Sequence, residues 1–199
     1  EGGGSALEEV WGGHVCVVRP PAQPWTPHLS DGFRVGANLY QPARMPSMEE
    51  LLYAHDENYV DAFRHGALDE TSMRKIGLPW SEALVERTLA EVAGTILTAD
   101  LALATGIAVN CAGGTHHAHF DHGSGYCIFN DLAITAKRVI QRKAADRVLI
   151  LDLDVHQGDG MARITSDDAS VFTLSVHCAE NFPANKARSD RDVSLPKGT

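Results

Sequence analysis

The stretch Arg147–Gly160, RVLILDLDVHQGDG, constrains the fold more than any other part of the sequence. Its branched apolar run, Val148–Leu151, is typical of a buried strand. Asp152, Asp154 and His156 then alternate along the chain, so they share one face and can converge just beyond the strand. A carboxylate oxygen and an imidazole nitrogen that converge suit a divalent metal ion, zinc first. The plainer alternative is a strand end that carries solvated acids.

The bulk composition fits one globular domain. The chain has 199 residues and is 44% hydrophobic, which is enough for a single domain with a real core. Its net charge of −9 argues against sequence-independent nucleic-acid binding, which needs a basic face. The same charge is compatible with a cationic substrate, although a solvated acidic surface is the default explanation. We therefore expect no direct nucleic-acid partner.

The sequence indicates neither a membrane segment nor an export signal. No apolar run is expected to reach membrane-spanning length, and the glycine-rich start lacks the basic and apolar regions of a secretory signal. The four cysteines are widely spaced, without a CxxC pair, and are interpreted as reduced thiols. We expect a cytoplasmic protein, or a nuclear one if the source is eukaryotic, without a membrane partner.

The chain divides into an irregular start and one longer domain. Residues 1–46 are predicted to hold one strand, His14–Val18, within otherwise irregular, proline-rich sequence. Residues 47–199 are predicted to form the N-terminal part of a single α/β domain. The segment SMEE, which begins at Ser47, is a capping box that predicts a helix start.

Two more helices are expected in the first half of that domain. A short one is predicted near Asn58–Gly66, where Tyr59, Val60 and Phe63 fall on one side. The longest apolar periodicity runs over Glu82–Ala104, after Ser81 and before Gly106, a typical C-terminal stop.

The second half alternates between strand and helix patterns. Strands are expected at Ile107–Cys111, Val148–Leu151 and Val171–Val176, with a helix at Leu132–Arg142 and a short helix or turn at Met161–Ile164. This alternation predicts right-handed crossovers and a parallel sheet. Ligands of such sheets bind beyond the carboxyl ends of the strands. A polar cluster follows each of the three strands, so the sequence predicts a site at that edge.

Two adjacent histidines, His116 and His117, follow the first of these strands on a glycine-flanked loop. A metal-activated water needs a base to take its proton and later an acid to protonate the leaving group, and imidazole suits both tasks. A carboxylate on the far nitrogen orients each ring best. Asp152 and Asp159 are the two acids available for this. The alternative is a satisfied histidine pair in a polar loop.

Two long segments together resemble one known family. GGTHHAHFDHGSGYCIFND and LILDLDVHQGDG are similar to the zinc-dependent histone deacetylase superfamily, which includes acetylpolyamine amidohydrolases. The segments IGLPWSEALVERTLAEVAGTI and HCAENFPANKARSD resemble the class IV branch and its bacterial deacetylase-like relatives. The resemblance runs from about Ser47 to the C-terminus. It implies a three-layer α/β arginase/deacetylase-like fold with a mainly parallel sheet, here incomplete.

The resemblance also implies roles for individual residues. Asp154 and His156 match two zinc ligands. His117 matches the general base and acid, with Asp159 behind it. His116 matches a second, electrostatic histidine, with Asp152 behind it.

Two further sites follow from the same resemblance. Gly125 and Tyr126 match a Gly-aromatic pair beside the acyl-lysine channel, and Cys127 next to them is interpreted as a packed thiol rather than a nucleophile. The family also binds a structural potassium ion near the zinc, and that site is matched by Asp152, Asp154, His156, Ser175 and Val176. A monovalent cation there would offset the concentrated carboxylates.

Two parts of the family pattern have no match in this chain. The third zinc ligand, an Asp, and the oxyanion donor, a Tyr, are expected in later loops beyond Thr199. Nearby candidates for a substitute ligand lack the spacing: His119, Asp121, His122 and His177. We therefore expect this chain to be the N-terminal portion of a longer protein, with an unpaired edge on its sheet.

Three functions remain open from sequence. The first is a zinc-dependent deacylase that acts on an acylated protein lysine or an acylated small amine. The second is a two-metal ureohydrolase, which shares the fold type, but these enzymes tend to carry Asp-x-His-x-Asp and this chain has Gly158 at the last position. The third is a non-catalytic acyl-binding or scaffold protein. Acyl chain length, substrate identity and oligomeric state are left open.

Overall fold

The helices begin where the sequence places capping side chains. In the computed structural model, which describes residues 41–199, Ser47 Oγ accepts from the N–H of Glu50, and the Glu50 carboxylate accepts from the N–H of Ser47. This capping box, predicted from sequence, opens the short helix α1, Met48–Leu51. The predicted strand His14–Val18 and the loop that follows it up to residue 40 lie outside the described residues.

Three further helices precede the loop of residues 113–130, which carries His116 and His117 and is called the histidine loop below. The predicted second helix is α2, Glu57–Arg64, and the predicted long helix is α4, Glu82–Thr105, which Ser81 caps and Gly106 ends. Helix α3, Glu70–Ile76, was not predicted. Its only buried residue is Ile76, so it has no apolar periodicity, although Asp69 caps its start and the left-handed Gly77 ends it.

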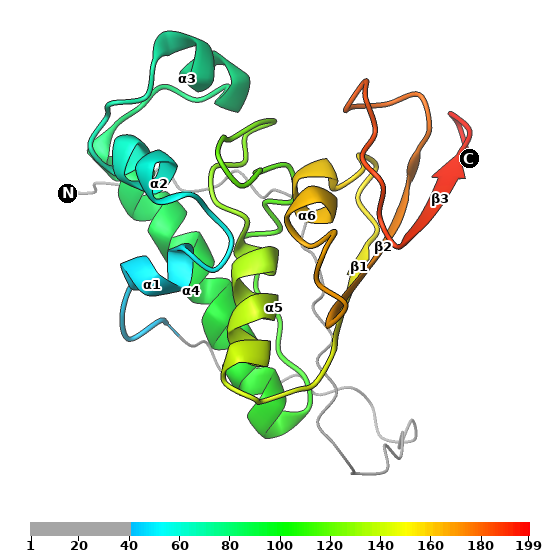
Figure 1. Cartoon of the computed structure of the whole chain (residues 1–199), viewed down its shortest axis with the longest axis horizontal. Coiled ribbons are helices and arrows are strands. Elements are labelled where there is room, and N and C mark those ends of the chain that lie inside the picture. Colours follow the sequence, from blue (N-terminus) through cyan, green and yellow to red (C-terminus); the bar gives the residue numbers. More distant parts are fainter. Residues whose placement is uncertain (1–40) are drawn as a thin grey trace, which may run out of the picture.

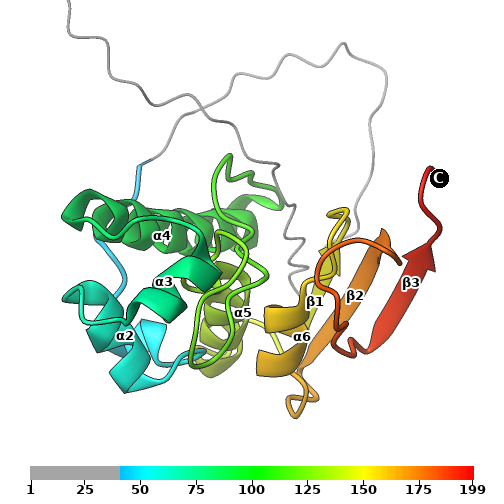
Figure 2. The ribbon, with the colours of Figure 1, turned by 90° about the horizontal axis from the view of Figure 1, so that it is seen from above.

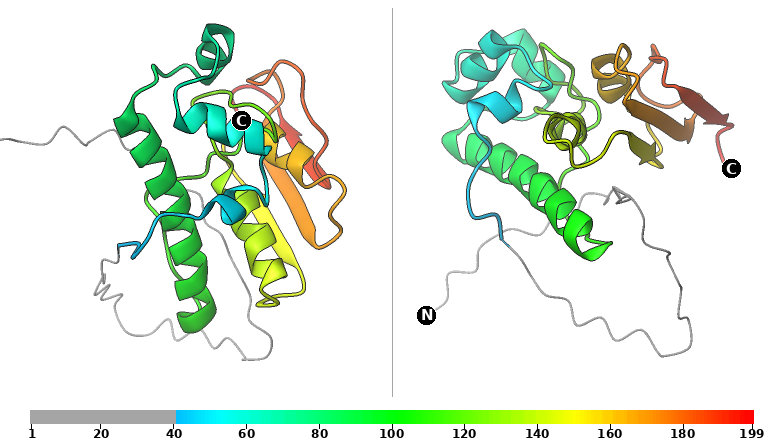
Figure 3. Two further views of the ribbon diagram at one scale, coloured as in Figure 1. Left: turned by 60° about the vertical axis from the view of Figure 1, so that its left-hand side comes forward. Right: turned by 60° about the horizontal axis from the view of Figure 1, so that its bottom comes forward.

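Helix α4 is more apolar than the sequence analysis predicted. By length and composition alone it could cross a membrane, with a mean hydropathy of 1.3 over its most apolar 18-residue window, so the expectation that no run approaches that length was wrong. A core helix passes the same test. Here α4 packs along α5, Asp131–Gln141, with residues such as Val92, Ile96 and Ala99 buried (Figure 1, Figure 3).

The sheet is parallel, as predicted. Strand β1, Val148–Asp152, pairs with β2, Val171–Cys178, which pairs with β3, Arg191–Leu195. Helix α6, Asp159–Ile164, forms the crossover from β1 to β2. Figure 2 shows the sheet beside the helical layer, with α6 against it. Strand β3 was not predicted because RDVSL carries no clear apolar alternation.

One predicted strand does not form. Residues Ile107–Cys111 are not in a strand, and the Ile107 side chain is 76% exposed. The segment is apolar enough for a strand, but strand structure needs a hydrogen-bonded neighbour, and within residues 41–199 none lies beside it. The prediction at this position was therefore wrong for the described structure.

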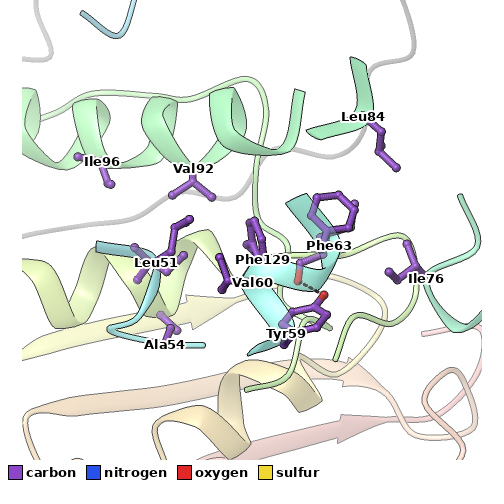
Figure 4. Packing of buried hydrophobic residues seen from close by; sticks show 13 residues of the cluster. Leu51, Ala54, Tyr59, Val60, Phe63, Ile76, Leu84, Val92, Ile96 and Phe129 are labelled. Atoms are coloured by element: carbon purple, nitrogen blue, oxygen red, sulfur yellow. Dashed lines mark hydrogen bonds between the residues drawn. The ribbon is translucent and has the colours of Figure 1, made fainter. Parts of the chain in front are cut away.

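Within residues 41–199, two apolar clusters form the core. The first joins α1, α2, α4 and the start of α5, and Figure 4 shows the rings of Tyr59, Phe63 and Phe129 packed at its centre, where Tyr59 donates to the backbone oxygen of Ile128. The second joins α5, β1, α6 and β2 through residues such as Val139, Ile150 and Met161.

Only one face of the sheet is covered in the described residues. Leu149, Leu151 and Phe172 point away from the second cluster and are exposed. The prediction of a fully buried β1 was therefore wrong: the burial of this strand alternates, as in a sheet covered on one face.

Candidate active site

The histidine loop is held by the N-terminus of α5. The buried carboxylate of Asp131 accepts hydrogen bonds from the N–H of Gly114 at 2.9 Å, from the N–H and hydroxyl of Thr115 at 2.8 and 2.7 Å, and from the hydroxyl of Thr95 at 2.6 Å. Gly113 has φ +93°, and a Cβ there would strike Asp131. The loop therefore needs a glycine at this turn and a carboxylate beneath it.

A second anchor comes from the residue before Asp131. The Asn130 amide donates to the carbonyl of Ala118 at 3.0 Å, and its oxygen accepts from the N–H of Ala133, which caps α5. The N–H of Asn130 donates to Nε2 of His55 at 2.8 Å. Burial lowers the pKa of His55 to about 4, so its ring is neutral and can accept this bond.

Each of the two adjacent histidines meets one of the predicted carboxylates. Nδ1 of His116 lies 2.6 Å from Oδ2 of Asp152, and Nδ1 of His117 lies 2.7 Å from Oδ1 of Asp159. All four side chains are buried, and the two imidazole centroids are 4.1 Å apart. A Cβ at Gly158 would lie 2.5 Å from Asp152 Oδ2, so only glycine lets the chain pass over this pair.

The ionisation of Asp159 fixes the protonation of His117. Burial would raise the pKa of Asp159, but hydrogen bonds from His117 and His119 outweigh it and hold the pKa well below its usual range. A carboxylate can only accept, so Nδ1 of His117 carries the proton and donates. Burial lowers the pKa of His117 itself. The ring therefore keeps a free lone pair on Nε2, which is what a general base needs.

Asp154 and His156 follow β1 and lie beside the histidine pair. Oδ1 of Asp154 is 3.0 Å from Nδ1 of His156 and 3.9 Å from Nε2 of His116. The rings of His117 and His156 have centroids 5.7 Å apart. The side chains of Asp154 and His156 are partly exposed, whereas those of His116 and His117 are buried. The structure thus brings these four residues to one place at the carboxyl end of β1.

The side chains considered as substitute ligands have other partners. His119 contacts Asp159, His122 contacts Asp121, and His177 lies between the hydroxyls of two serines. Among residues 41–199, no three His, Cys, Asp or Glu side chains are grouped in a way that would hold a metal ion. The described donor set next to the histidine pair is therefore one carboxylate and one imidazole.

The residues matched to the acyl channel lie at different depths. A Cβ at Gly125 would be 2.9 Å from the His117 ring, so glycine leaves space against that ring. Tyr126 follows at a positive φ of 66° and is 59% exposed. Its N–H donates to the carbonyl of Ile76, and its ring lies against Gly77. Gly125 therefore lies beside the catalytic candidates and Tyr126 lies farther out.

Sequence reasoning missed Phe182. Its ring meets His117 edge to face at 4.8 Å and also faces His156 at 6.1 Å, while 42% of the residue stays exposed. A single aromatic residue in a loop gives no periodic signal, although the Phe-Pro pair lies within a segment that carried the resemblance. Phe182 and Gly125 together flank His117.

Of the residues matched to a potassium site, Asp152 ends β1, and Ser175 and Val176 lie on the neighbouring strand β2. Asp152 is the register partner of Ser175, and Val176 follows. The N–H of Asp154 donates to Oδ1 of Asp152 at 3.0 Å. The Ser175 hydroxyl lies 2.9 Å from Nδ1 of His177.

Cys127 is a packed thiol. It is buried beneath the loop, and burial raises the pKa of its thiol to about 12. A nucleophilic cysteine needs a lowered pKa.

Comparison with known proteins gives the same family as the sequence motifs. The Histone deacetylase domain family matches residues 27–198. An uncharacterized protein of Picosynechococcus sp. is 54% identical over 170 residues, which cover 85% of this chain and 56% of that protein. Histone deacetylase 2 of Arabidopsis thaliana is 32% identical over 181 residues, covering 86% and 46%. Acetoin utilization protein AcuC of Staphylococcus aureus is 37% identical over 169 residues, covering 77% and 43%.

A solved structure supports the same conclusion. The crystal structure of an HDAC homolog from Aquifex aeolicus matches with a TM-score of 0.61 and 25% identity, over 77% of this chain and 46% of that one. The chain spans about half the length of the curated relatives it matches. Its helices and parallel sheet are consistent with an incomplete α/β arginase/deacetylase fold. The chain belongs to the histone deacetylase family.

Proposed function

We propose that the protein is a zinc-dependent deacylase that hydrolyses the amide bond of an acylated lysine or a related acylated small amine. Membership of the histone deacetylase family supports a deacylase in general. The observation that carries the proposal is the buried bond between His117 and Asp159, set beside Asp154 and His156.

Asp154 and His156 would hold the zinc ion. Their donor atoms lie 3.0 Å apart. Two ligands of one tetrahedral zinc ion, each at about 2 Å, lie roughly 3.3 Å apart, so this pair fits. A catalytic zinc usually takes three protein ligands, and the family resemblance implies an Asp from a later loop. When bound, the ion would polarise the acyl carbonyl and lower the pKa of water.

His117 would move the protons. Its Nε2 takes a proton as water attacks the acyl carbon, because Nδ1 is engaged by Asp159. The imidazolium, stabilised by that carboxylate, then gives its proton to the departing amine. His116, held by Asp152, would stabilise charge beside the reacting atoms. An oxyanion donor, a Tyr in the family pattern, is expected from a later loop.

The surroundings of His117 favour a slender substrate. Gly125 and Phe182 flank the ring, and a Cβ at Gly125 would lie only 3.2 Å from the Phe182 ring, so any substrate stem that approaches His117 here would have to be narrow. Tyr126 would pack on the outer part of that stem. An acylated lysine and an acylated polyamine both have such a stem.

A potassium ion is proposed beneath the zinc. Its ligands would come from Asp152, Asp154, His156, Ser175 and Val176, the last through its backbone oxygen. The proximity of Asp152 to Asp154 and Ser175 supports this assignment. A cation there would offset the paired carboxylates.

The test uses the full-length protein, an acetyl-lysine peptide and an acetylated polyamine. We expect about one zinc ion per protein by elemental analysis. His117→Ala should keep the metal and lose at least about 100-fold in turnover. His156→Ala should lose both. His65→Ala, which removes an exposed histidine from its Asp61 partner, is the matched control and should change neither.

Two results would count against this proposal. Intact turnover in His117→Ala would overturn the base assignment. Robust deacetylation by the 199-residue chain alone would overturn the need for a later ligand and oxyanion donor.

A non-catalytic acyl-binding or scaffold protein is the second candidate. The observation in its favour is the donor set of only two residues beside the histidine pair in the described chain. It predicts peptide binding without turnover in the full-length protein. The ureohydrolase alternative is disfavoured, because a side chain at position 158 would meet Asp152 and His116.

A further inference from the structure

One carboxylate in the site serves two imidazoles. Oδ1 of Asp159 is 2.7 Å from Nδ1 of His117, and Oδ2 is 3.2 Å from Nε2 of His119. All three side chains are largely buried, with 5%, 9% and 12% of His117, Asp159 and His119 exposed. His119 is thus a second partner of the acid that orients the candidate base.

The two bonds restrict the carboxylate from both ends. Asp159 is ionised, because its pKa is held well below its usual range, so both imidazole nitrogens must donate to it. With an N–H on each oxygen, the carboxylate cannot rotate without losing one bond. The bond from His119 therefore favours the orientation that keeps the proton of His117 on Nδ1 and its lone pair on Nε2.

His119 is itself firmly held. Its N–H donates to the carbonyl of His122 at 2.9 Å, and the two rings stack at 4.3 Å with an interplanar angle of 8°. Between them, the carbonyl of Phe120 accepts from the N–H of Asp56 at 2.9 Å and faces Nδ1 of His55. The turn that carries His119 is thus attached to the segment between α1 and α2.

We propose that His119 is a positioning residue: its Nε2–H holds Asp159 in the orientation that fixes the tautomer of His117. Its kinetic consequence rests on the proposed deacylase function, whereas its effect on the tautomer does not. His119 acts through Asp159 and has no direct role at the reacting atoms.

The test compares His119→Phe, which keeps a ring without a donor, with His119→Gln, whose amide can donate near the position of Nε2. The full-length protein is labelled with ¹⁵N-histidine, and two-bond ¹H–¹⁵N spectra report which ring nitrogen of His117 is protonated. The His117 signals are assigned by their loss in His117→Gln. Zinc content and circular dichroism are measured on each variant.

We expect a single Nδ1–H tautomer for His117 in the wild type and a mixture of tautomers in His119→Phe. Turnover should fall about 10-fold in that variant, in kcat rather than KM, with zinc content unchanged. His119→Gln should restore both readouts. The matched controls His65→Phe and His65→Gln alter an exposed His–Asp pair on α2 and should change nothing.

Three outcomes would overturn the positioning role. They are an unchanged His117 tautomer in His119→Phe, an equal loss in the Phe and Gln variants, or a loss confined to KM. If His119→Phe does not fold, His119→Asn replaces it, because its shorter amide does not reach Asp159. If the wild type has no deacylase activity, the proposed function fails, and the ¹⁵N spectra still decide the role of His119.

Discussion

Nε2 of His55 accepts a 2.8 Å hydrogen bond from the N–H of Asn130, which lies 75 positions later in the chain. On the other side of the ring, Nδ1 faces the carbonyl of Phe120 at 3.3 Å. His55 therefore links the segment after α1 to two positions of the histidine loop, Phe120 and Asn130. The link depends on a neutral ring, because protonated Nε2 cannot accept.

The stability of the protein should fall in mild acid through His55. Burial lowers the pKa of His55 from 6.5 to about 4. Between pH 6.5 and pH 4 this histidine is therefore protonated in the unfolded chain but neutral in the folded chain. This contribution is complete above pH 6.5 and declines towards pH 4, by at most about 1.4 kcal/mol per pH unit.

The measurement is urea unfolding of wild type and His55→Gln at pH 7 and pH 5. The wild type should lose free energy of unfolding between pH 7 and pH 5 through His55, whereas His55→Gln should not, because glutamine does not titrate. The difference in free energy of unfolding between the two proteins should therefore be smaller at pH 5. A difference that stays constant between the two pH values would contradict the link to His55.

Loss of the Asp131 carboxylate should loosen the histidine loop. Asp131→Ala leaves the partly buried N–H groups of Gly114 and Thr115 without their acceptor, at a cost of about 1–3 kcal/mol in all. We expect a lower free energy of unfolding and faster amide exchange from Gly113 to Ala118. Asp69→Ala is a control, because it removes an exposed cap from α3 and should lower the free energy of unfolding much less.

Gly160 should not tolerate a methyl group. A Cβ there would strike the backbone oxygen of Ala118 and lie 2.7 Å from the carbonyl carbon of His117. Helix α6 would have to move off the loop, which also breaks the bond from the N–H of Met161 to the carbonyl of His116. We expect Gly160→Ala to unfold at lower temperature and to lose activity.

Gly94→Ala is the matched control for that substitution. It also lies in a helix, but the atoms nearest to its Cβ would belong to the side chain of Asn110, at 3.1 Å, rather than to backbone. Helix propensity favours alanine by about 1 kcal/mol, so this variant should be no less stable than the wild type. An equal loss in both variants would contradict close packing at Gly160 as the cause, because alanine is favoured over glycine in both helices.

The buried guanidinium of Arg138 should contribute substantially to stability. It donates to Glu50 at 3.0 Å and to both carboxylate oxygens of Asp100 at 2.8 and 3.0 Å. Arg138→Leu should cost about 2 kcal/mol, less than for a fully isolated pair, because Glu50 keeps Arg44. Thermal and urea unfolding measure the cost. Arg87→Leu, at an exposed helical pair, should cost about 0.5 kcal/mol or less.

Local signals predicted the capped helices that also carry apolar periodicity, and strands β1 and β2. Ser47 and Ser81 cap the nearest residues on their own helices, so the sequence around them suffices. Strand β3 and the failure of Ile107–Cys111 depend on which backbone lies alongside, and that information is not local. The long helix α4 was predicted because apolar residues recur along it, whereas α3 buries only Ile76 and has no apolar periodicity.

The pairing of histidines with acids was a hypothesis from spacing and resemblance, and the structure brings His116 to Asp152 and His117 to Asp159. The supports beneath them were not predicted. Asp131, Asn130 and His55 act through contacts between distant segments, and nothing in their own neighbourhoods indicates this.

The bond from His117 to Asp159 closes a loop of 42 residues that contains all of α5 and β1. Closing a loop of this length costs chain entropy, which the docking of that helix and that strand must offset, so we expect the pair to form only after both have docked. A chain arrested with α5 undocked would still carry every residue of the site and yet be chemically inert.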